Sequence, residues 1–125
     1  MMDNLEELIP DFDQMEEFAR QAAELSAQIV VVKHALSMKE AEVVRDALTN
    51  KDYWIGNKQP SMSYCDKVVS KLGNTDADRE ELSNLREQLA DLVQRSEMLQ
   101  HIISLGRDKL DLYRTISANE RKGFL

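Results

Sequence analysis

Apolar residues recur at alternating steps of three and four along two long stretches of this chain, and polar residues fill most positions between them. This spacing places the apolar side chains in one stripe along an α-helix, because the helix has about 3.6 residues per turn. The stretches cover residues 13–49 and 75–117. Their similar length predicts an all-α fold in which two long antiparallel helices pair as a helical hairpin or coiled coil.

The predicted stripes are interrupted at few positions. The earlier stripe is Met15, Phe18, Ala22, Leu25, Ile29, Val32, Leu36, Lys39 and Val43. The later stripe is Leu82, Leu85, Leu89, Leu92, Ser96, Leu99, Ile103, Gly106, Leu110 and Tyr113.

The second half of the later helix carries an additional apolar row, formed by Met98, Ile102, Leu105, Leu112 and Ile116. Two apolar rows on one helix indicate more than one partner helix, so we expect the chain to self-associate into a bundle or homo-oligomer. The interrupted heptad pattern does not select the number of subunits. The residues expected at the oligomer or partner interface are Leu82, Leu85, Leu89, Leu92, Leu99, Ile102, Ile103, Leu105, Leu112 and Ile116.

Capping signals predict where the long helices begin. Thr75 with Asp78, and Asp13 with Glu16, have the spacing of a capping box. The chain is then a single domain with five segments. They are an acidic segment at 1–12 with a helical turn or two ended by Pro10, a helix at 13–49, a connector at 50–74, a helix at 75–117 and a tail at 118–125.

The connector is predicted to contain a turn and a short helix. Gly56 and Asn57 supply the turn. A short helix is expected from about Met62 to Leu72, with Ser61 or Ser63 as its cap and Gly73 as its end. The apolar face of this short helix is expected to be Tyr64, Val68 and Leu72.

The net charge of −7 is confined to one end of the chain. Residues 1–24 contain eight acids and one base, Arg20, and the remaining residues balance. Acidic side chains are favourable near the positive end of a helix dipole, which is one explanation of this segment. The alternative is a tail that contacts a basic partner or shields a basic groove.

Catalytic chemistry is not indicated. His34 and His101 fall on different helices without a metal-spaced partner, and Cys65 has no neighbouring base in the sequence. We therefore expect no enzyme activity, no metal and no cofactor. A single cysteine, an acidic N-terminus and the lack of a long apolar run predict a soluble, cytoplasmic protein, in a host cell if the protein is viral.

The connector is the one place where aromatic and basic residues interleave. Aromatic rings can stack on bases and lysines neutralise phosphates, so this mixture is typical of single-strand binding. Alternatively, the rings close the apolar end of the hairpin and the lysines are only solvated. The candidate nucleic-acid-binding residues are Lys51, Tyr53, Trp54, Lys58, Lys67 and Lys71.

The order of these elements resembles the UvsY family of phage recombination mediators over roughly residues 25–124. Tyr53, Trp54 and Gly56 fit the family's Tyr-Tyr-x-Gly pattern, Lys58 fits the base that follows, and Arg107 fits an arginine of the final helix. The resemblance implies an oligomeric helical protein that binds single-stranded DNA. It also implies two protein partners, a strand-exchange recombinase and a single-strand-binding protein.

Two functions follow from these patterns as expectations. The first is a non-enzymatic oligomeric adaptor, in its most specific form a phage-type recombination or replication accessory acting on single-stranded DNA and its coating proteins. The second is a structural or regulatory coiled-coil protein that binds only other proteins, such as an assembly or virion component. The environment of Trp54 distinguishes them, since burial in the bundle favours the second and exposure beside lysines favours the first.

Overall fold

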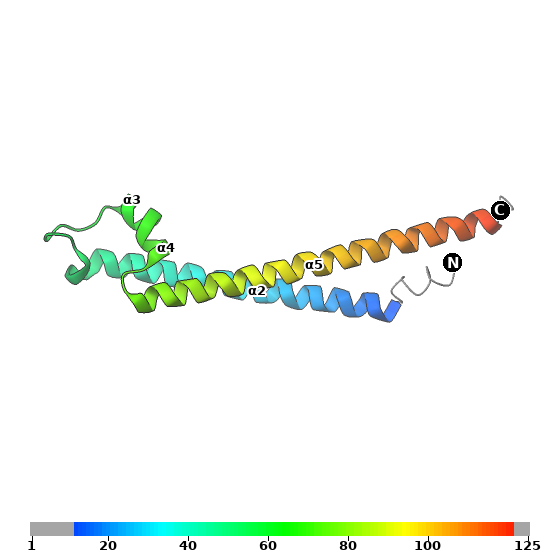
Figure 1. Ribbon diagram of the computed structural model, residues 1–125, viewed down its shortest axis with the longest axis horizontal. Helices are drawn as coiled ribbons and strands as arrows, with labels where there is room; N and C mark the ends of the chain where they lie inside the picture. The colour runs from blue at the N-terminus through cyan, green and yellow to red at the C-terminus, as the bar shows by residue number, and fades with distance from the viewer. Residues whose placement is uncertain (1–11, 122–125) are drawn as a thin grey trace. The chain divides into compact units, whose positions relative to one another are not determined.

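A computed structural model describes residues 12–121, and this part of the chain is an α-helical hairpin without a β-strand (Figure 1). The two long helices are α2 (Phe12–Thr49) and α5 (Asp76–Arg121). Between them lie η1 (Lys51–Tyr53), α3 (Met62–Tyr64), η2 (Cys65–Val69) and α4 (Ser70–Leu72). The predicted all-α class with two antiparallel helices and a short connecting helix is confirmed.

The stripes expected from the sequence coincide with the burial pattern. From Met15 to Val32, every stripe residue of α2 is at least half-buried, and the positions between them are exposed. In α5 the stripe is buried or half-buried from Leu82 to Leu110, and Tyr113 is exposed. The helical period of the sequence therefore identified the packed faces of both helices.

The contacts divide the chain into two compact units, and each is described separately. The first unit is Ala27–Val93 and contains the connector with the adjoining parts of α2 and α5. The second unit has residues 12–26 and 94–121 as its described part.

Within Ala27–Val93, polar contacts tie α2 to the start of α5. The ammonium of Lys39 lies 2.9 Å from Asp78 Oδ1 and 3.0 Å from Glu81 Oε2. The Asn74 side-chain amide donates to the carbonyl of Val43 at 2.8 Å. Residue numbers fall along α2 as they rise along α5, so these contacts record the antiparallel pairing.

The ion pairs of Lys39 explain how a cation can occupy a position in the apolar stripe of α2. Its side chain is 10% exposed and that of Asp78 is 15% exposed, so the stem is covered while the charge is paired. Hydrogen bonds to Asp78 and then to Glu81 raise the pKa of Lys39, against the effect of burial. Burial disfavours ionised Asp78, but hydrogen bonds from Lys39 and from the Asn74 backbone outweigh it and lower the pKa of Asp78.

The predicted cap of the second long helix is present. Thr75 Oγ1 accepts a hydrogen bond from the backbone N–H of Asp78 at 3.1 Å. In a capping box, the Asp78 side chain would accept from the backbone N–H of Thr75. Here its Oδ2 accepts instead from the backbone N–H of the preceding residue, Asn74, at 3.0 Å. At the other long helix, α2 begins at Phe12, so Asp13 lies inside the first turn.

The short connecting helix begins and ends where the sequence indicated. Ser61 Oγ accepts from the backbone N–H of Tyr64 at 3.1 Å, so Ser61 rather than Ser63 is the cap. Gly73 ends the helix with φ +77°, and a Cβ atom at this position would lie 2.4 Å from Asp78 Cβ. Only glycine fits this turn without displacement.

The predicted apolar face of the short helix is wrong by one position. Tyr64 and Leu72 are exposed by 46% and 53%, whereas Cys65 and Val69 are 0% and 7% exposed. The buried pair joins Val43 and Ala47 of α2 in a small core, which Val44 and Leu48 flank. Val68, the third residue of the predicted face, is half-buried. Residues Cys65–Val69 form a π-helical turn within the short helix.

In the second unit, the later stripe of α5 is covered up to Leu110, whereas the additional row is exposed except for Ile116, which is half-buried. Ser96 and Leu99 are 7% and 8% exposed, and Gly106 is buried. Met98, Ile102, Leu105 and Leu112 are exposed. The acidic segment up to residue 11, including the turn predicted before Pro10, and residues 122–125 lie outside the described residues.

Candidate nucleic-acid interface

Tyr53 and Trp54, the aromatic pair of the connector, lie at the end of the short helical turn η1, which directly follows α2. The Asn50 side chain accepts from Asp52 N at 3.0 Å, and the Asn50 carbonyl accepts from Tyr53 N at 3.1 Å. The Lys51 carbonyl accepts from Trp54 N at 3.0 Å. These bonds satisfy the backbone groups of the turn and fix where the two rings leave the chain.

A tight turn follows the aromatic pair. Gly56 and Asn57 have φ +59° and +63°, and the backbone N–H of Lys58 donates to the Ile55 carbonyl at 3.0 Å. Two consecutive positive φ angles and this bond define a type I′ turn, the form favoured by two-residue hairpins. The Gln59 side chain then donates to the Leu48 carbonyl at 2.8 Å, which ties the returning chain to the end of α2.

The aromatic rings are half-buried. Tyr53 and Trp54 both have intermediate exposure, and the indole Nε1 of Trp54 is buried without a hydrogen-bond partner among the described residues. The Lys51 ammonium lies 5.9 Å from the centroid of the Trp54 ring, within the range of a cation–π interaction. The rings therefore help to close the end of the hairpin while part of their surface stays accessible.

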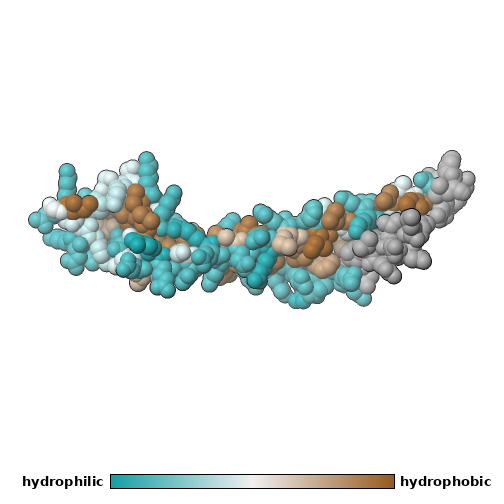
Figure 2. Space-filling model, in the orientation of Figure 1, coloured by the Kyte–Doolittle hydropathy of each residue, from teal (hydrophilic) through white to brown (hydrophobic). Residues whose placement is uncertain are grey.

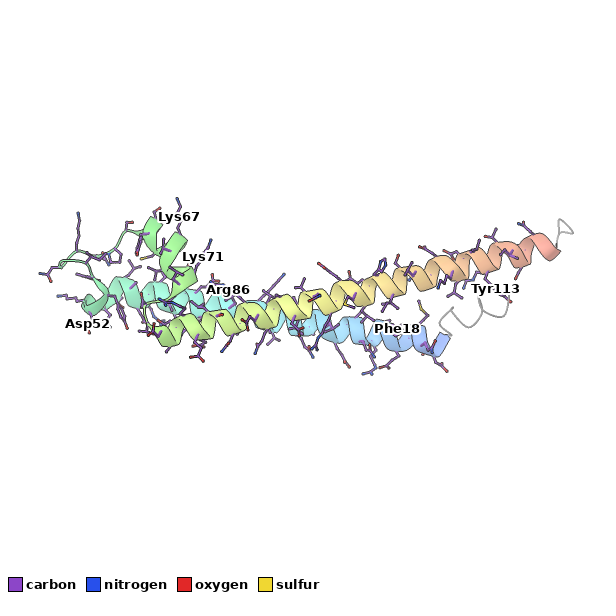
Figure 3. The ribbon with its side chains drawn as sticks, in the orientation of Figure 1. Phe18, Asp52, Lys67, Lys71, Arg86 and Tyr113 are labelled. Atoms are coloured by element: carbon purple, nitrogen blue, oxygen red, sulfur yellow. The ribbon has the colours of Figure 1, made fainter. Side chains whose placement is uncertain are left out.

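The four candidate lysines are exposed cations without an acidic partner among the described residues. Lys51, Lys58, Lys67 and Lys71 are all exposed, and none forms an ion pair within residues 12–121. Lys67 and Lys71 extend from the short helix away from α2 (Figure 3). Unpaired lysines keep their full attraction for an anionic partner.

The bases next to the connector behave differently, because they serve the fold. Arg86 of α5 donates to the Lys71 carbonyl at 2.6 Å and lies 3.7 Å from Glu40 of α2. Lys39 pairs with two carboxylates, as described above. Lys39 and Arg86 are thus paired bases that connect segments of the fold. The four lysines of the connector have no acidic partner among the described residues.

An open groove of about 550 Å³ runs beside the connector, along α2 and η2. Val44 and Leu48 line part of it, and Glu40, Arg45 and Asp66 are among its charged residues. Two acids against one base do not favour an anion. The groove is therefore not part of the candidate interface.

The residues expected at an oligomer interface fall into two groups. Leu82 and Leu99 are 0% and 8% exposed, so packing within the chain already covers them. Ile102, Leu105 and Leu112 are 42%, 46% and 56% exposed and could contact another helix. Half-buried positions complete the set, namely Leu85, Leu89, Leu92, Ile103 and Ile116.

The candidate site residues taken from the sequence did not include Ile55, an apolar residue of the connector whose side chain is 78% exposed. The signal was present, because an apolar residue directly before the Gly56–Asn57 turn cannot reach a helical stripe. It also stands between Lys51 and Lys58 in the sequence.

The described residues do not form a metal site, and their one cysteine is buried. In residues 12–121 no group of three His, Cys, Asp or Glu side chains could hold a metal ion. The Cys65 thiol is buried, and desolvation together with the charge of Asp66 raises its pKa, which disfavours the reactive thiolate. None of the described helices is long and apolar enough to cross a membrane.

The fold defines the class, an α-helical hairpin whose connected end carries an aromatic and basic loop. No protein-family model, curated protein or solved structure matches this chain. The function must therefore be inferred from the residues of the site.

Proposed function

We propose that this protein is a non-enzymatic, self-associating adaptor that contacts single-stranded DNA through its connector. In its most specific form it is a phage-type recombination or replication accessory that acts on single-stranded DNA, its coating protein and a recombinase. The contact uses Lys51, Tyr53, Trp54, Lys58, Lys67 and Lys71.

One observation carries this proposal: the connector holds two half-buried aromatic rings and four exposed lysines without an acidic partner among the described residues, and one of these lysines, Lys51, lies over the Trp54 ring. Phosphate contacts supply most of the affinity of proteins for nucleic acid, and accessible rings add base stacking. Each chain offers only a few cations. Self-association would place several connectors on one strand and raise the overall affinity without a new contact.

A second candidate function is a protein-only adaptor. The exposed row of Met98, Ile102, Leu105 and Leu112 favours it, because an apolar row on a helix surface is a typical protein contact. The buried indole Nε1 of Trp54 favours it as well. In this function the exposed row and the acidic N-terminal end are the contact surfaces, and the lysines are solvated.

Fluorescence anisotropy of a labelled single strand, titrated at low and then moderate salt, distinguishes the two. The DNA-binding function predicts binding that weakens steeply with salt and quenches Trp54. Lys51→Ala with Lys58→Ala should reduce the salt slope by about two. Lys33→Ala on α2 is the matched control, an exposed lysine outside the connector. Absence of binding at low salt and high protein concentration would leave the protein-only adaptor.

A further inference from the structure

The tip of the connector, residues 51–58, exposes an apolar side chain to solvent. Ile55 is the most exposed of the large hydrophobic residues in the described chain. Figure 2 shows apolar atoms among hydrophilic ones at this end of the Ala27–Val93 unit. Single apolar residues are common on protein surfaces, so the setting of Ile55 decides whether it has a role.

Ile55 lies at the start of a tight turn that hydrogen bonds hold in place. The bond from Lys58 N to the Ile55 carbonyl closes it, and the Gln59 side chain anchors it to α2. Gly56 and Asn57 both have positive φ, which fixes the hairpin form. A side chain held on such a turn loses little conformational entropy when it binds, so its contact is strengthened by preorganisation.

A cation lies directly beside this apolar side chain. Ile55 and Lys58 form an isolated antiparallel bridge, and residues opposed in such a bridge place their side chains on the same face. Lys51, the other exposed lysine of the loop, lies over the neighbouring Trp54 ring. The tip thus combines one apolar projection with two unpaired positive charges, which complement the bases and phosphates of a nucleic acid.

We propose that Ile55 inserts as a wedge between two adjacent bases of single-stranded DNA, while Lys58 and Lys51 contact the phosphates on either side. Apolar wedges of this kind unstack neighbouring bases, and basic residues beside them hold the backbone. A single strand has no base pairs to break, so only stacking opposes insertion. The inference rests on the proposed function and adds the residue that disrupts stacking.

The experiment uses a single-stranded oligonucleotide that contains 2-aminopurine, whose fluorescence rises when its neighbours unstack. The full chain should increase this fluorescence on binding. Ile55→Ser should abolish the increase and weaken binding about 5- to 10-fold at an unchanged salt slope. Ile55→Leu should restore both, and Lys58→Ala should lower the salt slope by about one while retaining part of the increase.

Met62→Ser is the matched control, because Met62 is 60% exposed on the same connector but outside the turn. This variant should behave as the parent protein. Circular dichroism of each variant should show unchanged helicity, since Ile55 makes no part of the buried core.

Three outcomes would overturn the wedge. A normal fluorescence increase with Ile55→Ser would do so while leaving DNA binding by the connector intact. Failure of the parent chain to bind the strand at low salt would remove the wedge and the proposed function together. If Ile55→Ser changed the sedimentation of the protein without DNA, Ile55 would instead belong to a contact between protein chains.

Discussion

The two units of the molecule differ in the ion pairs described for them and in the apolar side chains that they leave exposed. In Ala27–Val93, residues far apart in the sequence are joined by buried apolar contacts, by the Lys39 ion pairs and by the Asn74 bond to Val43. In the other unit, Arg20 pairs with Glu17 and Glu24 within α2, and Arg114 pairs with Asp111 within α5.

The exposed apolar side chains, rather than the ion pairs, indicate where a partner helix could bind. Exposed pairs within one helix contribute only a few tenths of a kcal/mol, whereas contacts between distant segments hold a tertiary fold. The Ala27–Val93 unit closes its own core around Cys65 and Val69. Both units leave apolar side chains exposed: Val30, Val31 and Met38 in Ala27–Val93, and Met98, Ile102, Leu105 and Leu112 in the other unit. The second set forms a row at helical spacing on α5 and so resembles half of an interface.

The largest loss of stability is expected from Gly73→Ala. The new Cβ would meet Asp78 Cβ at 2.4 Å, and φ +77° disfavours any other residue. We expect the free energy of unfolding, measured by urea denaturation, to fall by ~3 kcal/mol. Gly56→Ala is the matched control: φ is +59° but nothing lies within 4 Å of the added atom, so about 1 kcal/mol is expected. Equal losses would show that the clash at Gly73 is relieved.

Lys39→Met is expected to cost less. The substitution keeps the apolar stem but leaves the carboxylates of Asp78 and Glu81 without their ammonium partner. A partly buried network lies between exposed pairs and fully buried ones, so a loss of ~2 kcal/mol is expected in the same denaturation measurement. Lys33→Met, at an exposed position of α2, should change stability by less than about 0.5 kcal/mol. If both substitutions were equally mild, the ion pairs would not be what holds the start of α5.

These residues also mark the limit of what the sequence predicts. Helical periodicity is a local property, so the stripes, the Thr75 cap and the Gly73 end could be read directly. The partner of Lys39 could not, because its carboxylates are about forty residues away and meet it only through the fold. The face of the short helix was misassigned for a similar reason, since the covered side is the one that packs against Val43 and Ala47 of α2, far away in the sequence.

The candidate site divides in the same way. Its lysines, its aromatic pair and the Gly56–Asn57 turn were evident from composition and turn chemistry. That the lysines lack acidic partners, and that the Trp54 indole nitrogen is buried, depends on the packing of several segments. Partner contacts and burial of this kind follow only from the three-dimensional arrangement of the chain.

Acid should reduce the effect of Lys39→Met. The folded-state pKa of Asp78 is lowered from 3.8, so its stabilising charge is fully present above about pH 4 and is lost as pH falls through the folded value. Lys39 has a raised pKa, so its contribution persists at neutral pH and disappears only in strong base. The stability gap between the parent chain and Lys39→Met should therefore shrink as the pH falls from 7 to 2.5. A constant gap would assign the loss to packing of the lysine stem.

The smallest effect on stability, and the most direct test of the difference between the units, is expected from Leu105→Glu. Leu105 is 46% exposed, so the unfolding free energy of the single chain should change by less than about 0.5 kcal/mol. The proposed self-association, measured by analytical ultracentrifugation, should weaken at least about tenfold, because a charge would replace the apolar side chain that the proposal places between chains. Val31→Glu provides the same change on α2, within the Ala27–Val93 unit, at a side chain that is 67% exposed and outside the row on α5, and should leave sedimentation unaltered. If Val31→Glu dissociated the protein and Leu105→Glu did not, the Ala27–Val93 unit would be the one that needs a partner, and the Met98–Leu112 row would be ordinary solvated surface.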